Sequence, residues 1–98
     1  MKMHHPVHPG EILADYLEGS NITISQLAAR IHVARKTVSD IVNGKARVTV
    51  PMARRLGRAL GTNAGVWLRL QQQRDEWEIS QQSDEDLQDI QPFERVAG

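Results

Sequence analysis

The stretch TISQLAARIHVARKTVSDIVNGK, residues 23–45, determines the fold that this sequence predicts. Thr23 followed three residues later by Gln26 is the capping-box pattern that opens a helix, and apolar residues then recur on one helical face. A tight turn separates this helix from a second one. The second begins near Arg35 and ends at Gly44, because glycine tolerates a positive φ. Two short helices joined in this way indicate a helix-turn-helix.

The second helix of the pair carries apolar residues on one side and polar residues on the other. Val38, Ile41 and Val42 are expected to point inward. Long donors and a short acceptor on the opposite side suit the major groove of DNA, where base edges carry the sequence information. We expect four side chains to reach the bases: Arg35, Lys36, Ser39 and Asp40.

Other interpretations of these polar residues remain open. Any of the cations can contact phosphate only, which positions a protein without specifying sequence. Asp40 can accept from the N4 amino group of cytosine, but it also lies four residues after Lys36, where the two side chains can pair on the helix surface. The pair is the favoured interpretation, with Asp40 orienting Lys36.

Length and composition restrict the class of protein. A chain of 98 residues predicts one small domain, and the lack of cysteine excludes disulfides, thiolate metal sites and cysteine nucleophiles. No stretch approaches the roughly 20 apolar residues of a membrane span, so we expect a cytoplasmic protein without a membrane partner. No nucleophile, base and orienting group come together in a recognisable pattern, so we do not expect an enzyme or a cofactor.

The net charge of zero conceals two regions of opposite charge. Residues 1–74 contain eleven Lys/Arg and four Asp/Glu, a net charge of +7, whereas residues 75–98 contain one Arg and eight Asp/Glu, a net charge of −7. A basic body suits a polyanionic partner such as DNA. The acidic end can fold back on that body, face a basic protein, or remain solvated.

Three further helices complete an all-α prediction. Pro9 and Glu11 suit the first turn of a helix over residues 9–19; Thr49 caps a helix that Gly61 closes; and Thr62 opens a fifth helix that continues to about Ser80. Residues 1–8 form a flexible arm, 9–80 the domain and 81–98 an acidic tail. The residues expected on the buried sides of these helices are Ile12, Leu13, Tyr16, Leu17, Val50, Ala53, Leu56, Leu60, Val66, Trp67 and Leu70.

Some polar and apolar residues lie outside this core. Arg54, Arg55 and Arg58 share the other side of the fourth helix, as a solvated face, a partner for the acidic tail, or a docking surface. His4, His5 and His8 have a spacing that can chelate a metal, but without helical geometry we do not expect a metal site. The apolar residues expected at a dimer interface are Trp77, Ile79, Leu87 and Ile90.

Four segments together resemble one family. They are HPGEIL at residues 8–13, LAARIHVARKTVSDIVNGK at 27–45, VPMARRLGRALGT at 50–62, and VWLRLQ at 66–71. The combination is similar to the HigA-type antitoxins of the XRE helix-turn-helix superfamily, which share a five-helix domain with phage repressors. The helix-turn-helix stretch alone would identify only the superfamily.

The resemblance implies an antitoxin of a type II toxin–antitoxin system. Such a protein binds a small basic mRNA-cleaving toxin and, as a homodimer, represses its own operon by binding operator DNA. The positions that hold the DNA backbone in phage repressors correspond here to Thr23, Thr37, Asn43, Lys45 and Arg47. The acidic tail is then a candidate to compete for the RNA-binding surface of the toxin.

Two departures and two alternatives accompany this resemblance. His32 occupies the turn position commonly filled by glycine, and Ala34 the position of a common Ser or Thr cap. The backbone amides left free at the start of the helix after Ala34 could bind a phosphate.

The first alternative is a stand-alone transcriptional repressor of the same superfamily without a toxin. The second is an interaction protein whose basic surface serves another protein.

Overall fold

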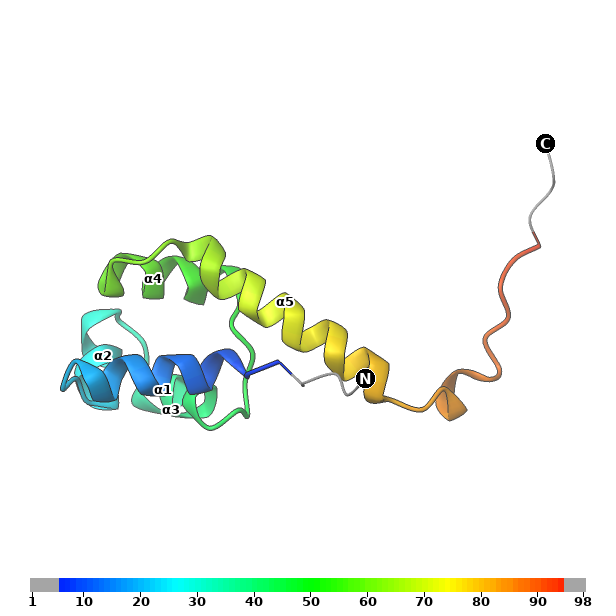
Figure 1. Ribbon diagram of the computed structural model, residues 1–98, viewed down its shortest axis with the longest axis horizontal. Helices are drawn as coiled ribbons and strands as arrows, with labels where there is room; N and C mark the ends of the chain where they lie inside the picture. The colour runs from blue at the N-terminus through cyan, green and yellow to red at the C-terminus, as the bar shows by residue number, and fades with distance from the viewer. Residues whose placement is uncertain (1–5, 95–98) are drawn as a thin grey trace.

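A computed structural model describes residues 6–94, which contain five α-helices, one short 3-10 helix and no strand. The helices α1 to α4 pack into a body, and α5 extends from this body toward the exposed C-terminal segment (Figure 1). The predicted all-α, five-helix fold is therefore confirmed. The elements are α1 (Pro9–Gly19), α2 (Ile24–Arg30), α3 (Arg35–Val42), α4 (Val50–Leu60), α5 (Ala64–Gln81) and the 3-10 helix η1 (Glu85–Leu87).

Most helix ends follow the local signals. The hydroxyl of Thr23 accepts from the backbone N–H of Gln26 while the Gln26 side chain accepts from the Thr23 N–H, a complete capping box. Thr49 caps α4 and Gly61 ends it in the left-handed conformation. The prediction that Thr62 opens α5 is wrong. Asn63 is the cap, because its side chain accepts from the Gly65 amide.

The core lies where α1 to α4 meet the first turns of α5. Its residues are Leu13, Leu17, Leu27, Ala28, Ile31, Val38, Ile41, Val48, Met52, Ala53, Leu56, Leu60 and Trp67. Trp67 reaches this core as predicted, and its indole N–H donates to the Thr62 hydroxyl. Thr62 therefore satisfies the polar end of a buried aromatic ring and does not cap a helix.

Four residues expected on the buried side are more exposed than predicted. Val50 is 57% exposed and Val66 is 38% exposed. Each lies in the first turn of its helix, at the edge of the body. In α4 the buried residue of the first turn is Met52. Ile12 and Tyr16 on α1 are also more than a third exposed. The Tyr16 hydroxyl nevertheless donates to the Leu60 carbonyl at the end of α4, 2.8 Å away.

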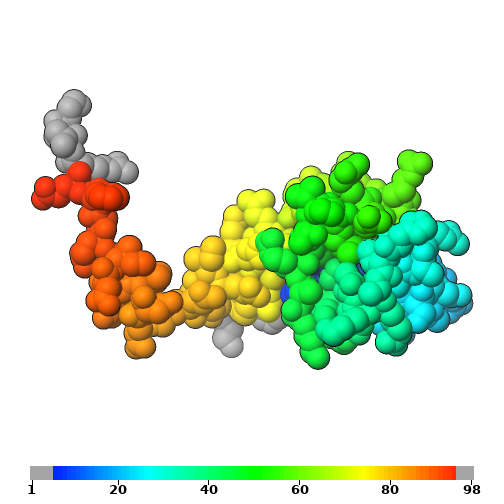
Figure 2. Space-filling view, turned by 180° about the vertical axis from the view of Figure 1, so that it is seen from behind, coloured from blue at the N-terminus to red at the C-terminus, as the bar shows by residue number. Residues whose placement is uncertain are grey.

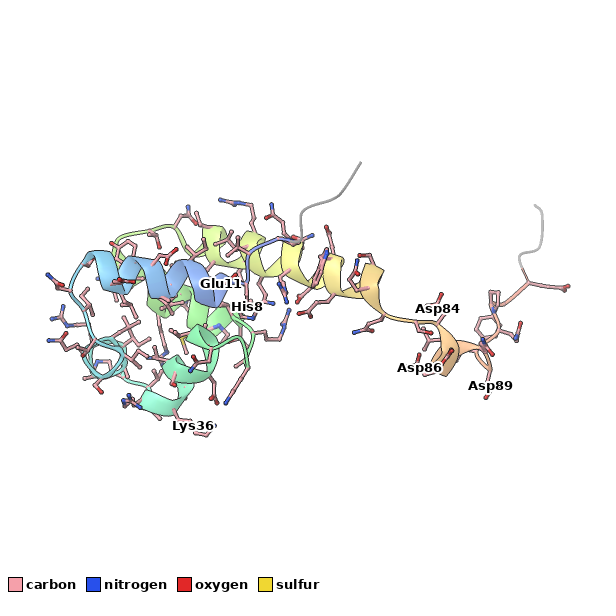
Figure 3. The ribbon with its side chains drawn as sticks, turned by 60° about the horizontal axis from the view of Figure 1, so that its bottom comes forward. His8, Glu11, Lys36, Asp84, Asp86 and Asp89 are labelled. Atoms are coloured by element: carbon pink, nitrogen blue, oxygen red, sulfur yellow. The ribbon has the colours of Figure 1, made fainter. Side chains whose placement is uncertain are left out.

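The start of α1 is fixed against α3. His8 lies within the predicted arm, but it is the N-cap of α1: its Nδ1 accepts from the Gly10 amide and the Glu11 carboxylate accepts from the His8 amide (Figure 3). Gly10 is buried so closely against α3 that a β-carbon there would lie 1.8 Å from the Ile41 carbonyl oxygen. The absence of a side chain at Gly10 is what permits this approach.

The second half of α5 leaves the body. The Arg74 guanidinium lies 4.6 Å from the centre of the Trp77 ring, pairs with Glu78, and donates to the Pro6 carbonyl. These contacts hold the chain before α1 beside α5. Beyond Gln81 every described residue is exposed. Figures 1 and 2 show this segment leading away from the body. No helix within residues 6–94 is both long enough and apolar enough to cross a membrane.

Candidate nucleic-acid interface

The helix α3 presents a polar face that is supported from below. Val38 and Ile41 are only 1% and 2% exposed, and they anchor the helix to the core as predicted. Arg35 and Lys36 are exposed, and Ser39 and Asp40 are half-buried. The helix thus combines a fixed position with long polar side chains directed outward, which is what insertion into a major groove requires.

The two cations at the start of α3 are oriented by neighbouring polar groups. Arg35 Nε donates to the hydroxyl of Ser25 in the first turn of α2, at 3.1 Å. Lys36 Nζ lies 2.8 Å from Asp40 Oδ2, which is the predicted i, i+4 pair. Figure 3 labels Lys36 on α3. The Lys36 side chain is 83% exposed, so this pair directs the ammonium group more than it stabilises the fold.

The later residues of α3 continue the same polar face. Asn43 Nδ2 donates to Ser39 Oγ at 3.2 Å, and Asn43 forms the C-cap of the helix. Thr37 is exposed, while Thr23 is exposed at the N-cap of α2, where its hydroxyl oxygen already accepts from an amide. The hydroxyl proton of Thr23 remains available to donate to an external acceptor.

The loop after α3 is folded back onto that helix. Gly44 has φ of 74°, and the amides of Lys45 and Ala46 both donate to the Asp40 carbonyl. Lys45 and Arg47 are exposed on this loop, and Arg47 pairs with Asp75 of α5. The predicted phosphate contacts at Lys45 and Arg47 thus lie on a loop of defined conformation.

A buried amide ties this loop to α5. Gln71 is 4% exposed; its Oε1 accepts from the Val48 amide at 2.7 Å, and its Nε2 donates to Asp75 Oδ1 at 2.8 Å. Asp75 therefore bridges Gln71 and Arg47. The sequence does not single out Gln71 or Asp75, because the contact joins positions 23 residues apart and glutamine on a helix normally indicates a solvated face.

The turn of the helix-turn-helix keeps both departures from the family pattern. His32 adopts the left-handed conformation, with φ of 61°, as expected for a residue in the usual glycine position. Ala34 is the N-cap of α3 in an extended conformation and provides no side-chain hydrogen bond. The first amides of α3 therefore lack a side-chain cap on the face that carries Arg35 and Lys36.

The histidines with metal-ligand spacing and the residues expected at a dimer interface do not belong to α3. His4 and His5 lie outside the described residues, and the Nδ1 atom of His8 is engaged in capping α1. In the described part of the chain, no group of three His, Asp or Glu side chains is arranged to hold a metal ion. Among the residues expected at a dimer interface, Ile79, Leu87 and Ile90 are exposed and Trp77 is partly covered.

This geometry defines a helix-turn-helix protein, and comparison with known proteins agrees. Residues 13–67 match the helix-turn-helix family model. The chain belongs to this family, in the group that includes the HigA antitoxins, which confirms the resemblance stated from the sequence.

Two sequence relatives and one solved structure illustrate the group. The chain is 40% identical over 75 residues to the uncharacterized HTH-type transcriptional regulator YbaQ of Escherichia coli, covering 76% of this chain and 66% of YbaQ. It is 36% identical over 89 residues to the antitoxin HigA-1 of Vibrio cholerae, covering 90% and 84% of the two chains. Its structure is similar to Pseudomonas aeruginosa antitoxin HigA with the higBA promoter, with a TM-score of 0.78, 33% identity and coverage of 90% and 98%.

Proposed function

We propose that this chain is an antitoxin that binds operator DNA as a homodimer and represses its own operon. The observation that carries the DNA-binding part is the polar face of α3, fixed from beneath by Val38 and Ile41. Arg35 and Lys36 contact base edges, together with Ser39. Asp40, paired with Lys36, orients the ammonium group.

The proposed contacts to the DNA backbone lie before, within and after α3 along the chain. Thr23 precedes it at the start of α2, Thr37 lies within it, and Asn43, Lys45 and Arg47 follow it. Backbone contacts of this kind fix the register of a protein on DNA, while the base contacts discriminate sequence. In a homodimer the two α3 helices enter major grooves about one helical turn apart on an inverted repeat.

We infer the homodimer from apolar residues beyond the body. Ile79 is 72% exposed and Ile90 is 69% exposed, and Leu87 lies exposed between them along the chain. Trp77 begins this apolar series on α5. Full burial of an aliphatic side chain of this size in an interface stabilises the dimer by about 1.5–3 kcal/mol. Sedimentation equilibrium of the wild-type chain and of Ile79→Glu tests this, and an unchanged mass for the variant would contradict it.

The antitoxin role implies a toxin partner, a small basic protein that cleaves mRNA. Two proteins that this chain resembles are named as HigA antitoxins. The test is co-purification from the native operon followed by mass measurement of the complex. In such a complex the acidic C-terminal segment would face the RNA-binding surface of the toxin, and its deletion should then weaken toxin affinity.

A stand-alone repressor is the second candidate. The relative YbaQ is named as a transcriptional regulator, and the DNA-binding geometry of α3 is the same in either case. The two candidates differ in one observation. An adjacent reading frame whose product arrests growth unless this chain is co-expressed supports the antitoxin, and a chain with no such neighbour supports the repressor.

The DNA-binding proposal is tested with Arg35→Ala. A bidentate arginine–guanine contact provides about 1–3 kcal/mol of discrimination, so operator affinity should fall about 5- to 150-fold while affinity for random DNA changes little. Fluorescence anisotropy with both DNAs measures this. Arg69→Ala, an exposed arginine on α5, is the matched control. Equal losses for operator and random DNA would make Arg35 a backbone contact.

A further inference from the structure

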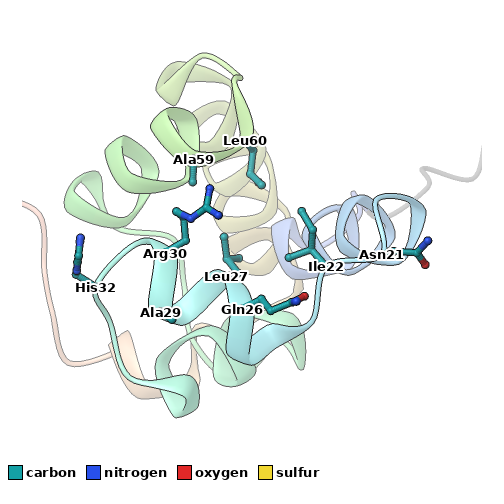
Figure 4. Close-up of a pocket in the computed structure, with 9 residues that line it drawn as sticks. All are labelled: Asn21, Ile22, Gln26, Leu27, Ala29, Arg30, His32, Ala59 and Leu60. Atoms are coloured by element: carbon teal, nitrogen blue, oxygen red, sulfur yellow. The ribbon is translucent and has the colours of Figure 1, made fainter.

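A groove runs between α2 and α4. None of its lining residues is among the proposed DNA contacts, although Gln26 in the lining bonds to Thr23. The groove consists of two adjoining hollows of about 650 and 720 Å³ that share Arg30, His32 and Ala59. Figure 4 shows Leu27 and Leu60 lining the first hollow, with Arg30 between α2 and α4. We call this surface the α2–α4 groove.

The α2–α4 groove is strongly basic. Its lining includes Arg30, Arg54, Arg55 and Arg58 and no carboxylate. Within residues 6–94, none of these arginines forms an ion pair, although Arg55 donates to the Ile31 carbonyl. The apolar lining residues Leu27, Ala59 and Leu60 form what we call the apolar floor of the groove. Four guanidinium groups beside this floor form a site for an acidic segment that also carries apolar side chains.

The chain itself contains a segment of this chemistry. Residues 84–94 hold five Asp/Glu and no Lys/Arg, with apolar residues at every third position. Those apolar residues, Leu87, Ile90 and Phe93, are 48%, 69% and 99% exposed. Figure 3 shows the labelled Asp84, Asp86 and Asp89 on the part of the chain that leaves the body. No hydrogen bond or ion pair joins residues 84–94 to α2 or α4 within the described chain.

The length of α5 decides which copy of this segment the groove receives. The groove ends beside Leu60, next to the start of α5, and α5 then runs for 18 residues, about 27 Å. From Gln81 to Asp86 the chain spans at most about 18 Å. Three of the five acids therefore cannot return to the first hollow, beside Leu60, in their own chain. The Pro51 end of the second hollow lies nearer, because Val48, three residues before Pro51, is bonded to Gln71 in the middle of α5. In Figures 1 and 2 the segment and α2 lie at opposite ends of the molecule.

We propose that the α2–α4 groove binds residues 84–94 of a second copy of this chain. The four arginines pair with the acids, and Leu87, Ile90 and Phe93 cover the apolar floor. Each exposed ion pair contributes little by itself, so the contact depends on several pairs formed together and on burial of the apolar residues. The proposal deepens the homodimer proposed above, because it assigns Leu87 and Ile90 of one copy to the groove of the other. It does not depend on the DNA partner, and it describes the chain without a toxin bound.

The lack of cysteine in this chain allows a direct test of proximity. Full-length Ala29→Cys, in the groove lining, is mixed with a mass-tagged full-length Gln88→Cys and mildly oxidised; both positions are exposed. We expect the disulfide-linked heterodimer to exceed that of the control pair Asp15→Cys with Gln88→Cys at least about fivefold. Equal yields from the two pairs would overturn the proposal. A disulfide that forms mainly within one chain carrying both cysteines would also overturn it.

Charge reversal then tests the chemistry of the contact. Arg58→Glu in the Ala29→Cys chain should reduce the heterodimer to the control level, whereas Arg69→Glu, the same charge change on α5 outside the groove, should not. Asp86→Arg in the partner chain should restore part of the yield lost with Arg58→Glu. Raising NaCl from about 0.05 M to about 0.5 M should also lower the yield, because it shortens the screening length severalfold. Equal effects of the two arginine reversals, or a yield independent of salt, would contradict the proposal.

Discussion

Gly10 is the residue at which two helices of the body come closest. A β-carbon there would lie 1.8 Å from the Ile41 carbonyl oxygen, so alanine fits only if α1 moves away from α3. Overpacking typically costs about 1–3 kcal/mol, and here the obstacle is backbone, so Gly10→Ala should lower the free energy of unfolding by about 3 kcal/mol in urea denaturation. Gly19→Ala on the same helix meets nothing within 4 Å and should be neutral or raise stability by up to about 1 kcal/mol. Equal effects would contradict this account.

Gln71 is the other residue whose role depends on the tertiary structure. Its side chain provides the hydrogen bond to the Val48 amide at the end of the loop that carries Lys45 and Arg47. Leucine at this position leaves a buried amide without a partner, which costs about 1–3 kcal/mol. Thermal unfolding of Gln71→Leu should show this loss, and Gln72→Leu, on the exposed side of the same helix, should stay within about 0.5 kcal/mol of wild type. A Gln71→Leu variant as stable as Gln72→Leu would show that the bond is dispensable.

The helices themselves could be predicted because their signals are local. Thr23 with Gln26, Thr49 and Gly61 each act within one turn of chain, and each begins or ends a helix where the sequence predicts it. The misplaced start of α5 has the same origin: Thr62 and Asn63 are both capable caps, and the choice depends on Trp67 taking the threonine hydroxyl.

The contacts between helices could not be predicted in this way. The fit of Gly10 against α3 and the bond from Gln71 to the chain after α3 join positions more than 20 residues apart, and neither residue has a local pattern that names its partner. Likewise, the polar face of α3 follows from helical spacing, whereas the bond from Arg35 to Ser25 depends on how α2 and α3 cross. The sequence therefore predicts which residues of α3 face outward, but not the contacts between helices that fix their positions.

The helix α3 begins without a side-chain cap, and this makes its stability adjustable. Ala34 has the extended conformation of an N-cap, with φ of −68° and ψ of 147°, so serine fits there without a backbone change. The serine hydroxyl oxygen would accept a hydrogen bond from one of the first backbone N–H groups of α3. Ala34→Ser should therefore raise the free energy of unfolding by about 0.5–2 kcal/mol. Urea denaturation measures this, with Ala29→Ser inside α2 as a control that should lose stability slightly. A loss of stability for Ala34→Ser would show that the hydroxyl does not reach the amides.

For the molecule as a whole, charge is separated along the chain. The basic residues are concentrated in the body and eight of the twelve acids follow Arg74, so the zero net charge of the chain does not describe the charge of either region. The acids before Asp84 serve the fold: Asp75 holds Arg47, and Glu78 pairs with Arg74. Those from Asp84 onward have no such partner in α2 or α4. The body therefore keeps the positive field that a nucleic-acid partner requires.

That field predicts a defined salt dependence for operator binding. Each neutralised phosphate contributes about −0.9 to the slope of log affinity against log salt concentration. If Lys45 of each protomer neutralises one phosphate, Lys45→Ala should make the slope of the dimer shallower by about 1.8. Anisotropy titrations at several KCl concentrations measure this. Arg69→Ala removes the same charge from α5 and should leave the slope unchanged. Equal changes in slope for both variants would mean that Lys45 acts through the general field of the body, without a phosphate contact of its own.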